Sequence, residues 1–322
     1  MIPLRLSYWL PLLAMLLPFS CSRESKPVKL DGPTMGTTWS LQIADKISEA
    51  KERDLSAFIH HELSALEDEL SHWKTDSDLS RWNRSTDTEW QSVSRSLAKT
   101  VAIAQRIGQE TDGALDVTAG PLIQLWGFGP SSSHARIPTD EEIAEALKLV
   151  GASHLEVETL SPSLKKDQPS VQINVASVTE GYAMDELILM LKAEGLKNFL
   201  LEIGGEVAAV GHAPEGGPWQ VGIQAPDGAK GETLEKLPLM DTCIATSGSY
   251  RHRYEKDGRT YSHLIDSRTG RPIEHKLVSV SVIHPQCVLA DGYATALMVL
   301  GPVEGRKVAQ RLGLRVIWLE EP

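Results

Sequence analysis

Residues 245–254 read Ala-Thr-Ser-Gly-Ser-Tyr-Arg-His-Arg-Tyr, and residues 258–272 read Gly-Arg-Thr-Tyr-Ser-His-Leu-Ile-Asp-Ser-Arg-Thr-Gly-Arg-Pro. This stretch combines small hydroxyl side chains, histidines, arginines and a carboxylate, and so many polar groups are costly to bury unless they are solvated or form a site. Its glycines permit tight turns and a close approach of the backbone to a ligand. Hydroxyls, backbone N–H groups and fixed cations suit a phosphate-bearing ligand. A β-hairpin with polar loops explains the same residues, so the stretch alone leaves both interpretations open.

Outward from this stretch, apolar residues recur with the periods of strands and helices. Residues 37–43 alternate apolar and polar side chains, which predicts a half-buried strand. Residues 55–70 carry apolar side chains at helical spacing, which predicts a long amphipathic helix. Asp140 can cap another helix that runs to about Val150. Further helices are predicted at 94–109, 179–194, 289–299 and 303–312, with a loop at 129–138. Strands and helices in this arrangement indicate an α+β or α/β fold.

Length and charge exclude some classes of protein. The 322 residues allow one large domain or two, and 41% hydrophobic residues are enough for a real core. A net charge of −11 argues against a nucleic-acid partner, because the phosphate backbone attracts basic surfaces. The chain contains no Walker A loop, no GxGxxG after a strand, no HExxH and no GxSxG. Rossmann, P-loop and α/β-hydrolase enzymes therefore find no support.

The N-terminus predicts export. Arg5 is the one cation before a nearly uncharged apolar run over residues 6–19, which is short for a membrane span and fits a signal peptide. Cys21 follows at once, as at a bacterial lipoprotein cleavage site. We therefore predict a lipoprotein signal peptide over 1–20, a lipid on Cys21 and a tether over 22–32. An ordinary secretory signal with an incidental cysteine, or an uncleaved anchor, are the alternatives.

The two remaining cysteines, Cys243 and Cys287, form neither a CxxC motif nor a zinc-like spacing. They could pair after export, but spacing in the sequence says nothing about their geometry. Two buried thiols that act as small hydrophobic residues are the interpretation we favour from the sequence alone.

Six further clusters occur in a characteristic order along the chain. They are Met35-Gly-Thr-Thr-Trp, Ser71-His-Trp-Lys-Thr-Asp-Ser-Asp-Leu-Ser-Arg-Trp-Asn83, Thr111-Asp-Gly-Ala-Leu-Asp-Val-Thr-Ala-Gly-Pro-Leu122, Ile173-Asn-Val-Ala-Ser-Val-Thr-Glu-Gly-Tyr-Ala-Met-Asp185, Glu202-Ile-Gly-Gly-Glu206 and Ala290-Asp-Gly-Tyr-Ala-Thr-Ala-Leu297. Together with residues 245–272, they resemble the ApbE family, the FAD:protein FMN transferases, over roughly residues 33–318. The resemblance implies an α+β fold with antiparallel sheets flanked by helices, in one compact two-lobed domain spanning 33–322.

A metal site is suggested first by spacing. Asp291 and Thr295 are four residues apart, so on a helix they share one face. A carboxylate and a hydroxyl suit a hard cation such as Mg²⁺, whereas a helix cap followed by a buried threonine is the structural alternative. The resemblance implies that both residues bind Mg²⁺, with Ser177 as a third ligand.

The resemblance also assigns residues to the FAD substrate. It places Met35 and Trp73 against the flavin, where thioether and aromatic groups suit a planar ring. This chain has Leu115 where phenylalanine is common in the family, Asn174 where aspartate is common, and Glu180 where many relatives have lysine. The residues implied to contact FAD are Met35, Trp73, Ala114, Leu115, Asp116, Asn174, Glu180 and Ile265.

For catalysis the resemblance points to His263 and Asp266, and histidine is the usual proton acceptor near neutral pH. A lone histidine is more often structural. The implied reaction is Mg²⁺-dependent: a Thr or Ser hydroxyl of an acceptor flavoprotein attacks the FMN-side phosphorus of FAD, and AMP leaves. The acceptors would be subunits of membrane redox complexes. The enzyme itself would be periplasmic and lipid-anchored, most simply to the inner membrane. An FAD pyrophosphatase and a non-catalytic flavin-binding lipoprotein are the alternative functions.

Overall fold

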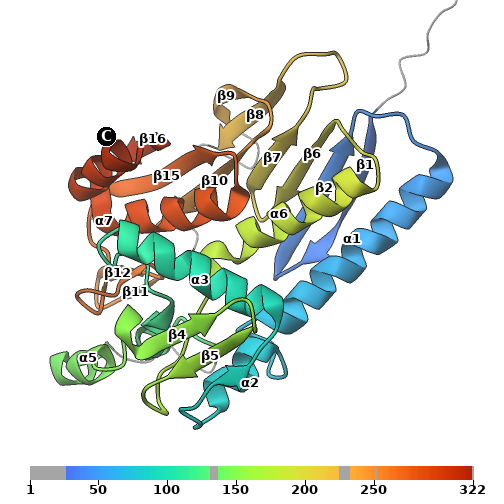
Figure 1. The fold of residues 1–322 in the computed structure, drawn as a ribbon. Coiled ribbons are helices and arrows are strands. Elements are labelled where there is room, and N and C mark those ends of the chain that lie inside the picture. The colour runs from blue at the N-terminus through green and yellow to red at the C-terminus, as the bar shows by residue number, and fades with distance from the viewer. Residues whose placement is uncertain (1–26, 131–136, 225–232, 251, 321–322) are drawn as a thin grey trace, which may run out of the picture.

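The computed structural model describes residues 27–130, 137–224, 233–250 and 252–320. A seven-stranded sheet with the order β1-β2-β6-β7-β10-β15-β16 forms its centre, and each neighbouring pair is antiparallel (Figure 1). Its strands are β1 (Val28–Thr34), β2 (Thr37–Ile43), β6 (Phe199–Ile203), β7 (Glu206–Val210), β10 (Thr242–Gly248), β15 (Leu277–His284) and β16 (Arg315–Glu320). Antiparallel neighbours and separate helices make this an α+β fold, as predicted.

Helices cover one face of the sheet. Apolar side chains from both layers form the main core, in which Trp39, Leu41 and Phe199 of the strands are almost fully buried. On the opposite face, the hairpin of β8 (Trp219–Gln224) and β9 (Thr233–Leu239) packs a smaller apolar cluster against the sheet. The covering helices are α1 (Glu49–Leu70), α3 (Arg95–Glu110), α6 (Ala176–Ala193) and α7 (Cys287–Leu312) (Figure 1).

A smaller lobe lies beyond α3, at the bottom of Figure 1. It contains a three-stranded antiparallel sheet with the order β3-β5-β4 and several short helices. Two hairpins, β11–β12 and β13–β14, come from the stretch that follows β10. These elements are α2 (Asp78–Arg84), β3 (Gln91–Ser92), η1 (Val117–Ala119), α4 (Gly120–Leu125), α5 (Asp140–Leu147), η2 (Ala152–His154), β4 (Leu155–Glu158), β5 (Ser163–Lys166), β11 (Arg253–Lys256), β12 (Arg259–Ser262), β13 (Ile265–Asp266) and β14 (Arg271–Pro272).

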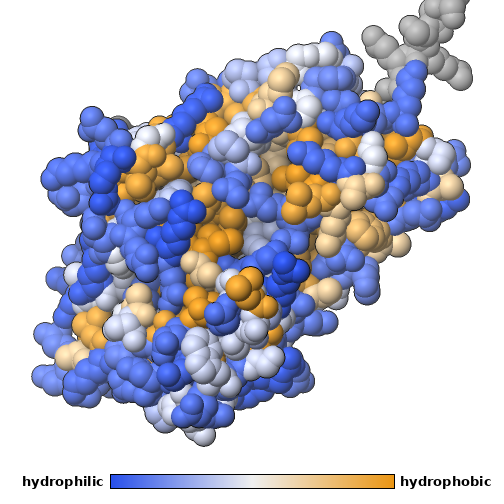
Figure 2. Space-filling view, in the orientation of Figure 1, coloured by the Kyte–Doolittle hydropathy of each residue, from blue (hydrophilic) through white to orange (hydrophobic). Residues whose placement is uncertain are grey.

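The surface on the helical side is mainly hydrophilic, and apolar residues show through in separate patches (Figure 2). Among the described residues, α7 is the one helix whose length and composition would allow it to cross a membrane. However, 78% of the 18-residue apolar stretch of this helix is buried inside the fold. This is the character of a core helix, whose apolar residues are covered by other elements.

Several predicted boundaries need correction. The helices predicted at 289–299 and 303–312 are the two segments of α7, which are separated by a kink where Gly301 adopts the non-helical φ of 75° immediately before Pro302; the first segment begins earlier than predicted, at Cys287. The α5 helix is capped by the Thr139 side chain in a capping box, so Asp140 is the first helical residue and not the cap. The tether is shorter than predicted, since β1 already begins at Val28. The signal peptide and Cys21 lie outside the described residues, as does most of the predicted loop.

The cysteines are paired. Cys243 on β10 and Cys287 at the start of α7 form a disulfide across 44 residues, with a Cα–Cα separation of 5.2 Å. The interpretation as two free buried thiols is therefore wrong. The reason lies in the tertiary structure. Cys243 is opposite His284 in the register of β10 and β15, and α7 begins three residues after His284, so Cys287 comes close to Cys243.

Candidate active site

Three segments that are distant in sequence meet at one end of the central sheet. The β1–β2 turn lies there at Met35 and Gly36, and the β6–β7 turn lies there at Gly204 and Gly205. Because β2 pairs with β6, the two turns are neighbours, and the Gly204 N–H donates to the Thr38 carbonyl at 3.1 Å. The β10 strand ends at the same end of the sheet, so the segment that follows it, with β11 to β14, begins there as well.

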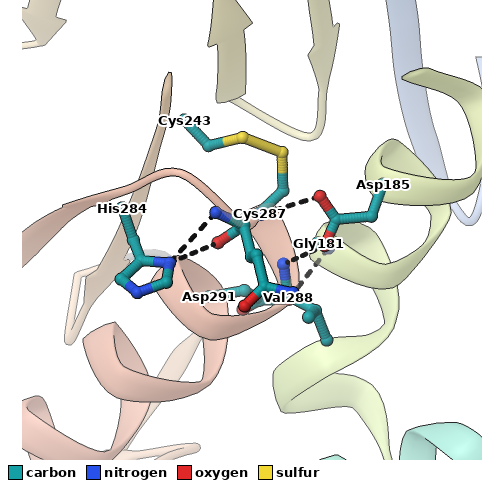
Figure 3. Close-up of a disulfide and its surroundings, with 8 residues drawn as sticks. Gly181, Asp185, Cys243, His284, Cys287, Val288 and Asp291 are labelled. Carbon is teal, nitrogen blue, oxygen red and sulfur yellow. Dashed lines mark hydrogen bonds between the residues drawn. A yellow bond between two sulfur atoms is a disulfide. The ribbon is translucent and has the colours of Figure 1, made fainter. Parts of the chain in front are cut away.

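Helices α6 and α7 pack antiparallel beside this edge. Gly181 lets their backbones touch, because a Cβ there would lie 2.5 Å from the Cys287 carbonyl oxygen. The Gly181 N–H donates to the Asp291 carboxylate at 3.1 Å (Figure 3). Asp291 is buried in the second turn of α7, whose N-cap is Gln286. The interpretation of Asp291 as a helix cap is therefore excluded.

The register of these helices places the proposed metal ligands together. Asp185 contacts Cys287 and Gly181 contacts Asp291, and each partner is one turn from the previous pair. The backbone contacts give the level more directly, because a Cβ on Gly181 would meet the Cys287 carbonyl and a Cβ on Gly292 would lie 2.9 Å from the Val178 side chain. Ser177 of α6 therefore lies near the level of Asp291, and Thr295 lies one turn farther along α7.

Carboxyl groups accumulate around Asp291. Burial and the charge of Glu180 raise the pKa of Asp291 well above its ordinary value, although hydrogen bonds from Gly181 and Glu206 act in the opposite direction. A hydrogen bond between the carboxyl groups of Asp291 and Glu206 requires a proton on one of them. A bound cation would replace that proton and relieve the repulsion among the three acids. A buried carboxylate beside two partly buried ones is a donor set that fits Mg²⁺.

The Met35 turn is held by α1. Met35 has φ 48°, an uncommon conformation for a residue other than glycine, and its N–H donates to Glu67 Oε1 at 2.7 Å. Lys74 lies 3.2 Å from the other oxygen of Glu67, in the loop that follows α1. Trp73 precedes Lys74 and is 62% exposed. The structure therefore brings the two residues assigned to the flavin ring to the same corner, with an exposed indole available for stacking.

The segment 114–116 adjoins the stretch after β12. Ser267 Oγ donates to the Gly113 carbonyl at 2.6 Å, and the Asn174 N–H donates to the Val117 carbonyl at 2.7 Å. Ala114 and Leu115 are buried, whereas Asp116 is partly exposed. The Asn174 side chain accepts the Ala176 N–H at 2.9 Å, so it supports the start of α6. These contacts join the sequence clusters at 111–122, 173–185 and 245–272.

His263 is oriented by the backbone. Its N–H and its ring Nδ1 both contact the His252 carbonyl oxygen, at 3.0 and 2.9 Å. A carbonyl only accepts hydrogen bonds, so Nδ1 carries the proton and Nε2 is the basic nitrogen of the neutral ring. The same neighbourhood contains stacked aromatic rings, with Tyr254 and Tyr261 at 5.3 Å between centroids. His263 therefore has the tautomer that a proton acceptor needs.

Asp266, the other residue predicted for catalysis, is engaged in an ion pair with Arg268. Its two carboxylate oxygens form a bidentate pair with the Arg268 guanidinium at 2.8 Å each, and Oδ1 also accepts the Arg268 N–H. A carboxylate engaged in this way holds a loop better than it accepts a proton. Ile265 beside it is buried with Trp126 and Ile143, so it supports the loop from the apolar side.

Sequence reasoning missed two acidic residues. Glu206 belongs to the Glu-Ile-Gly-Gly-Glu cluster and hydrogen-bonds Asp291, although neither its spacing nor the resemblance assigned it a role. Glu67 lies inside the long amphipathic helix, where a polar residue normally indicates a solvated face. Composition could have identified Glu206, since it is the one charged residue in a strand whose other residues are apolar. No local signal distinguishes Glu67.

Two hollows are lined by other residues. A cavity of about 700 Å³ between α1 and α2 is lined mostly by acids, among them Asp68, Glu69, Asp76 and Asp78. A second one, of about 410 Å³, lies beside Trp219 and Pro214. The acids of the first hollow would repel a pyrophosphate, which argues against a nucleotide site there.

Comparison with known proteins agrees with this arrangement. The model of the ApbE family matches residues 35–318. An FAD:protein FMN transferase of Vibrio cholerae is 38% identical over 97% of this chain and 93% of its own length, and one of Escherichia coli is 40% identical over 92% and 87%. The solved structures of the flavin transferase ApbE from Vibrio cholerae and of the apo flavinyl transferase ApbE from Pseudomonas stutzeri superpose with a TM-score of 0.83 each. They are 38% and 36% identical, and the matches cover 92% of this chain with 94% and 92% of theirs. The chain belongs to the ApbE family.

Proposed function

We propose that this protein transfers FMN from FAD to a Thr or Ser hydroxyl of an acceptor flavoprotein, with Mg²⁺ bound and with release of AMP. The observation that carries the proposal is the buried Asp291 carboxyl group beside Glu180 and Glu206. The names of the relatives support the same chemistry.

Asp291, Thr295 and Ser177 would hold the Mg²⁺ ion. When bound, the ion would neutralise charge that develops on the pyrophosphate and on the departing AMP. Asp291 supplies the anionic ligand, and the two hydroxyls supply neutral oxygens from facing helices. Glu180 and Glu206 surround Asp291 with negative charge, which strengthens the attraction for a cation.

The transfer requires that one proton move. As the acceptor hydroxyl oxygen bonds to the FMN-side phosphorus, the bond from that phosphorus to the bridging oxygen breaks, and AMP leaves with the bridging oxygen. The hydroxyl proton passes to Nε2 of His263, which its Nδ1–H contact with the His252 carbonyl leaves as the basic nitrogen. Asp266 and Arg268 would hold the loop that carries this histidine.

Mass spectrometry of the acceptor separates the possible functions. Mature protein, FAD, Mg²⁺ and a candidate acceptor are incubated together, and the acceptor is then weighed. A gain equal to one FMN less water supports the transferase. Release of FMN and AMP with an unmodified acceptor would indicate an FAD pyrophosphatase, and intact FAD would indicate a binding protein. The Asp291→Asn variant should abolish transfer while leaving the fold intact, with partial recovery in excess metal.

We also propose that the protein is exported and anchored by a lipid on Cys21, on the periplasmic side of the inner membrane. The Cys243–Cys287 disulfide supports export, because such bonds persist in oxidising compartments. A Cys21→Ala variant should leave the membrane fraction. Continued membrane association with an uncleaved leader would contradict the lipid anchor. Acceptors in the same compartment would be flavoprotein subunits of membrane redox complexes.

A further inference from the structure

We propose that Asp185 is a positioning residue for Asp291: from α6 it caps the N-terminus of α7 and thereby sets the register in which α7 presents its metal ligand. The inference rests on the proposed Mg²⁺ site. Asp185 itself lies two turns along α6 from Ser177 and is assigned no contact with metal or FAD.

The start of α7 lacks a cap of its own. Gln286 occupies the N-cap position, and its side chain makes no capping hydrogen bond. Asp185 takes this role from the neighbouring helix, since Oδ1 accepts the Cys287 N–H at 2.9 Å and Oδ2 accepts the Val288 N–H at 3.0 Å (Figure 3). The first N–H groups of a helix have no partner within it, and a carboxylate is favoured there by the helix dipole.

The two helices hold each other through reciprocal contacts. Asp185 of α6 binds backbone N–H groups of α7, and one turn away Asp291 of α7 binds the Gly181 N–H of α6. At Gly181 the backbones of α6 and α7 are in direct contact, so α7 cannot shift along α6 without changing this contact. Both carboxylates thus fix the same antiparallel register.

The disulfide fixes the position of the start of α7, and the Asp185 contact fixes the direction of the helix. Cys287 is already tied to β10 through Cys243, which fixes one point of α7. A helix held at one point can still pivot about it. The two-oxygen contact of Asp185 with consecutive N–H groups removes that freedom, because it defines the direction of the helix axis at the same turn.

A metal site spread over both helices is sensitive to such a pivot. Asp291 and Thr295 come from α7, whereas Ser177 comes from α6. Mg²⁺ requires near-ideal octahedral geometry, and displacing one helix along its neighbour by one residue would move a ligand by about 1.5 Å. Groups that orient metal ligands without touching the metal typically contribute about 10–100-fold to affinity.

The test compares Asp185→Ala and Asp185→Asn with Asp45→Ala as a matched control. Asp45 has the same chemistry elsewhere: its Oδ2 accepts the N–H groups of Lys197 and Asn198 at 2.6 and 2.9 Å. Mg²⁺ affinity is measured by isothermal titration calorimetry, and protection of the Cys287 and Val288 amides by hydrogen exchange. Transfer rates are recorded as a function of Mg²⁺ concentration.

We expect Asp185→Ala to weaken Mg²⁺ binding by about 10-fold or more and to expose the two amides, with most of the maximal rate restored at saturating Mg²⁺. Asp185→Asn, which keeps one acceptor oxygen, should lie between it and the wild type and remains informative if the alanine variant fails to fold. Asp45→Ala should lose stability without a change in Mg²⁺ affinity.

Two results would overturn the inference in distinguishable ways. A folded Asp185→Ala protein with wild-type Mg²⁺ affinity, or an equal loss in Asp45→Ala, would refute the positioning role alone. Absence of Mg²⁺ binding by the wild-type protein would refute the proposed metal site together with the inference that depends on it.

Discussion

At the scale of single residues, the site depends on side chains that hold other groups in place. Glu67 is an example: it fixes the strained Met35 turn from the last turn of α1. Burial alone would raise its pKa, but hydrogen bonds from Met35 and Lys74 outweigh burial, so the pKa of Glu67 lies below its ordinary value of 4.5. The charged form is therefore favoured by folding.

This linkage predicts how a Glu67→Gln variant behaves. Because the folded pKa is the lower one, the charge of Glu67 stabilises the fold fully above pH 4.5 and ceases to do so as pH falls through the folded pKa. We expect a loss of about 1 kcal/mol at neutral pH that shrinks in acid. Urea unfolding of the variant and the wild-type protein at neutral pH and in acid measures this loss. A loss of stability that is the same at both pH values would contradict the lowered pKa of Glu67.

His263 provides a second prediction at this scale. A His263→Gln variant should lose about 10²–10⁴-fold in transfer rate with little loss of stability, since it removes a proton acceptor. His252→Gln is the matched control, because His252 holds His263 through its backbone carbonyl and not through its ring. Single-turnover transfer followed by mass spectrometry measures both. Equal rates in the two variants would argue for a structural role of His263.

At the scale of elements, the kink in α7 has an identifiable cause and a compensating contact. Pro302 has no N–H to donate to the carbonyl of Met298, four residues earlier. His275 supplies the missing donor, since its Nε2 lies 2.8 Å from that carbonyl oxygen, while its Nδ1 accepts the Leu277 N–H at 3.3 Å. A histidine outside the helix thus replaces one of its backbone bonds.

We therefore expect His275→Ala to lower the free energy of unfolding by about 1–2 kcal/mol, because it leaves a partly buried carbonyl without its donor. His284→Ala is a close control: Nδ1 of His284, the last residue of β15, also accepts the N–H two residues ahead, but this hydrogen bond is exposed and involves no helix carbonyl. Its loss should stay within about 0.5 kcal/mol. Similar losses in the two variants, measured by urea unfolding, would show that the contact with α7 contributes little.

At the scale of the whole molecule, the disulfide joins the central sheet to its main core helix. Replacing both Cys243 and Cys287 by alanine opens a loop of 44 residues and should cost about 2–4 kcal/mol. Reductant should lower the free energy of unfolding of the wild-type protein, measured with urea, by a similar amount. It should leave the free energy of unfolding of the double variant unchanged. A wild-type protein indifferent to reductant would show that the bond contributes little in solution.

Much of this architecture was predictable. The period of apolar residues located β2, α1 and α3, and the ordered clusters predicted the α+β fold and the family, both of which are confirmed. Contacts at the ends of elements were less predictable: the start of α5 depends on the Thr139 hydroxyl, and at the kink in α7 the Met298 carbonyl is paired with His275. Periodicity reports burial and carries no information about a cap or a distant hydrogen-bond donor.

The sequence by itself determined which segments fold as strands and helices, and which residue types gather in each cluster, because burial period and motif spacing are local properties of the chain. Only the tertiary structure decided which groups meet. It paired Cys243 with Cys287, engaged Asp266 with Arg268, placed Glu206 beside Asp291 and made Asp185 the cap of another helix. Each of these contacts joins backbone or side-chain atoms whose separation is set by strand register and helix packing, and neither is encoded in the spacing of residues along one segment.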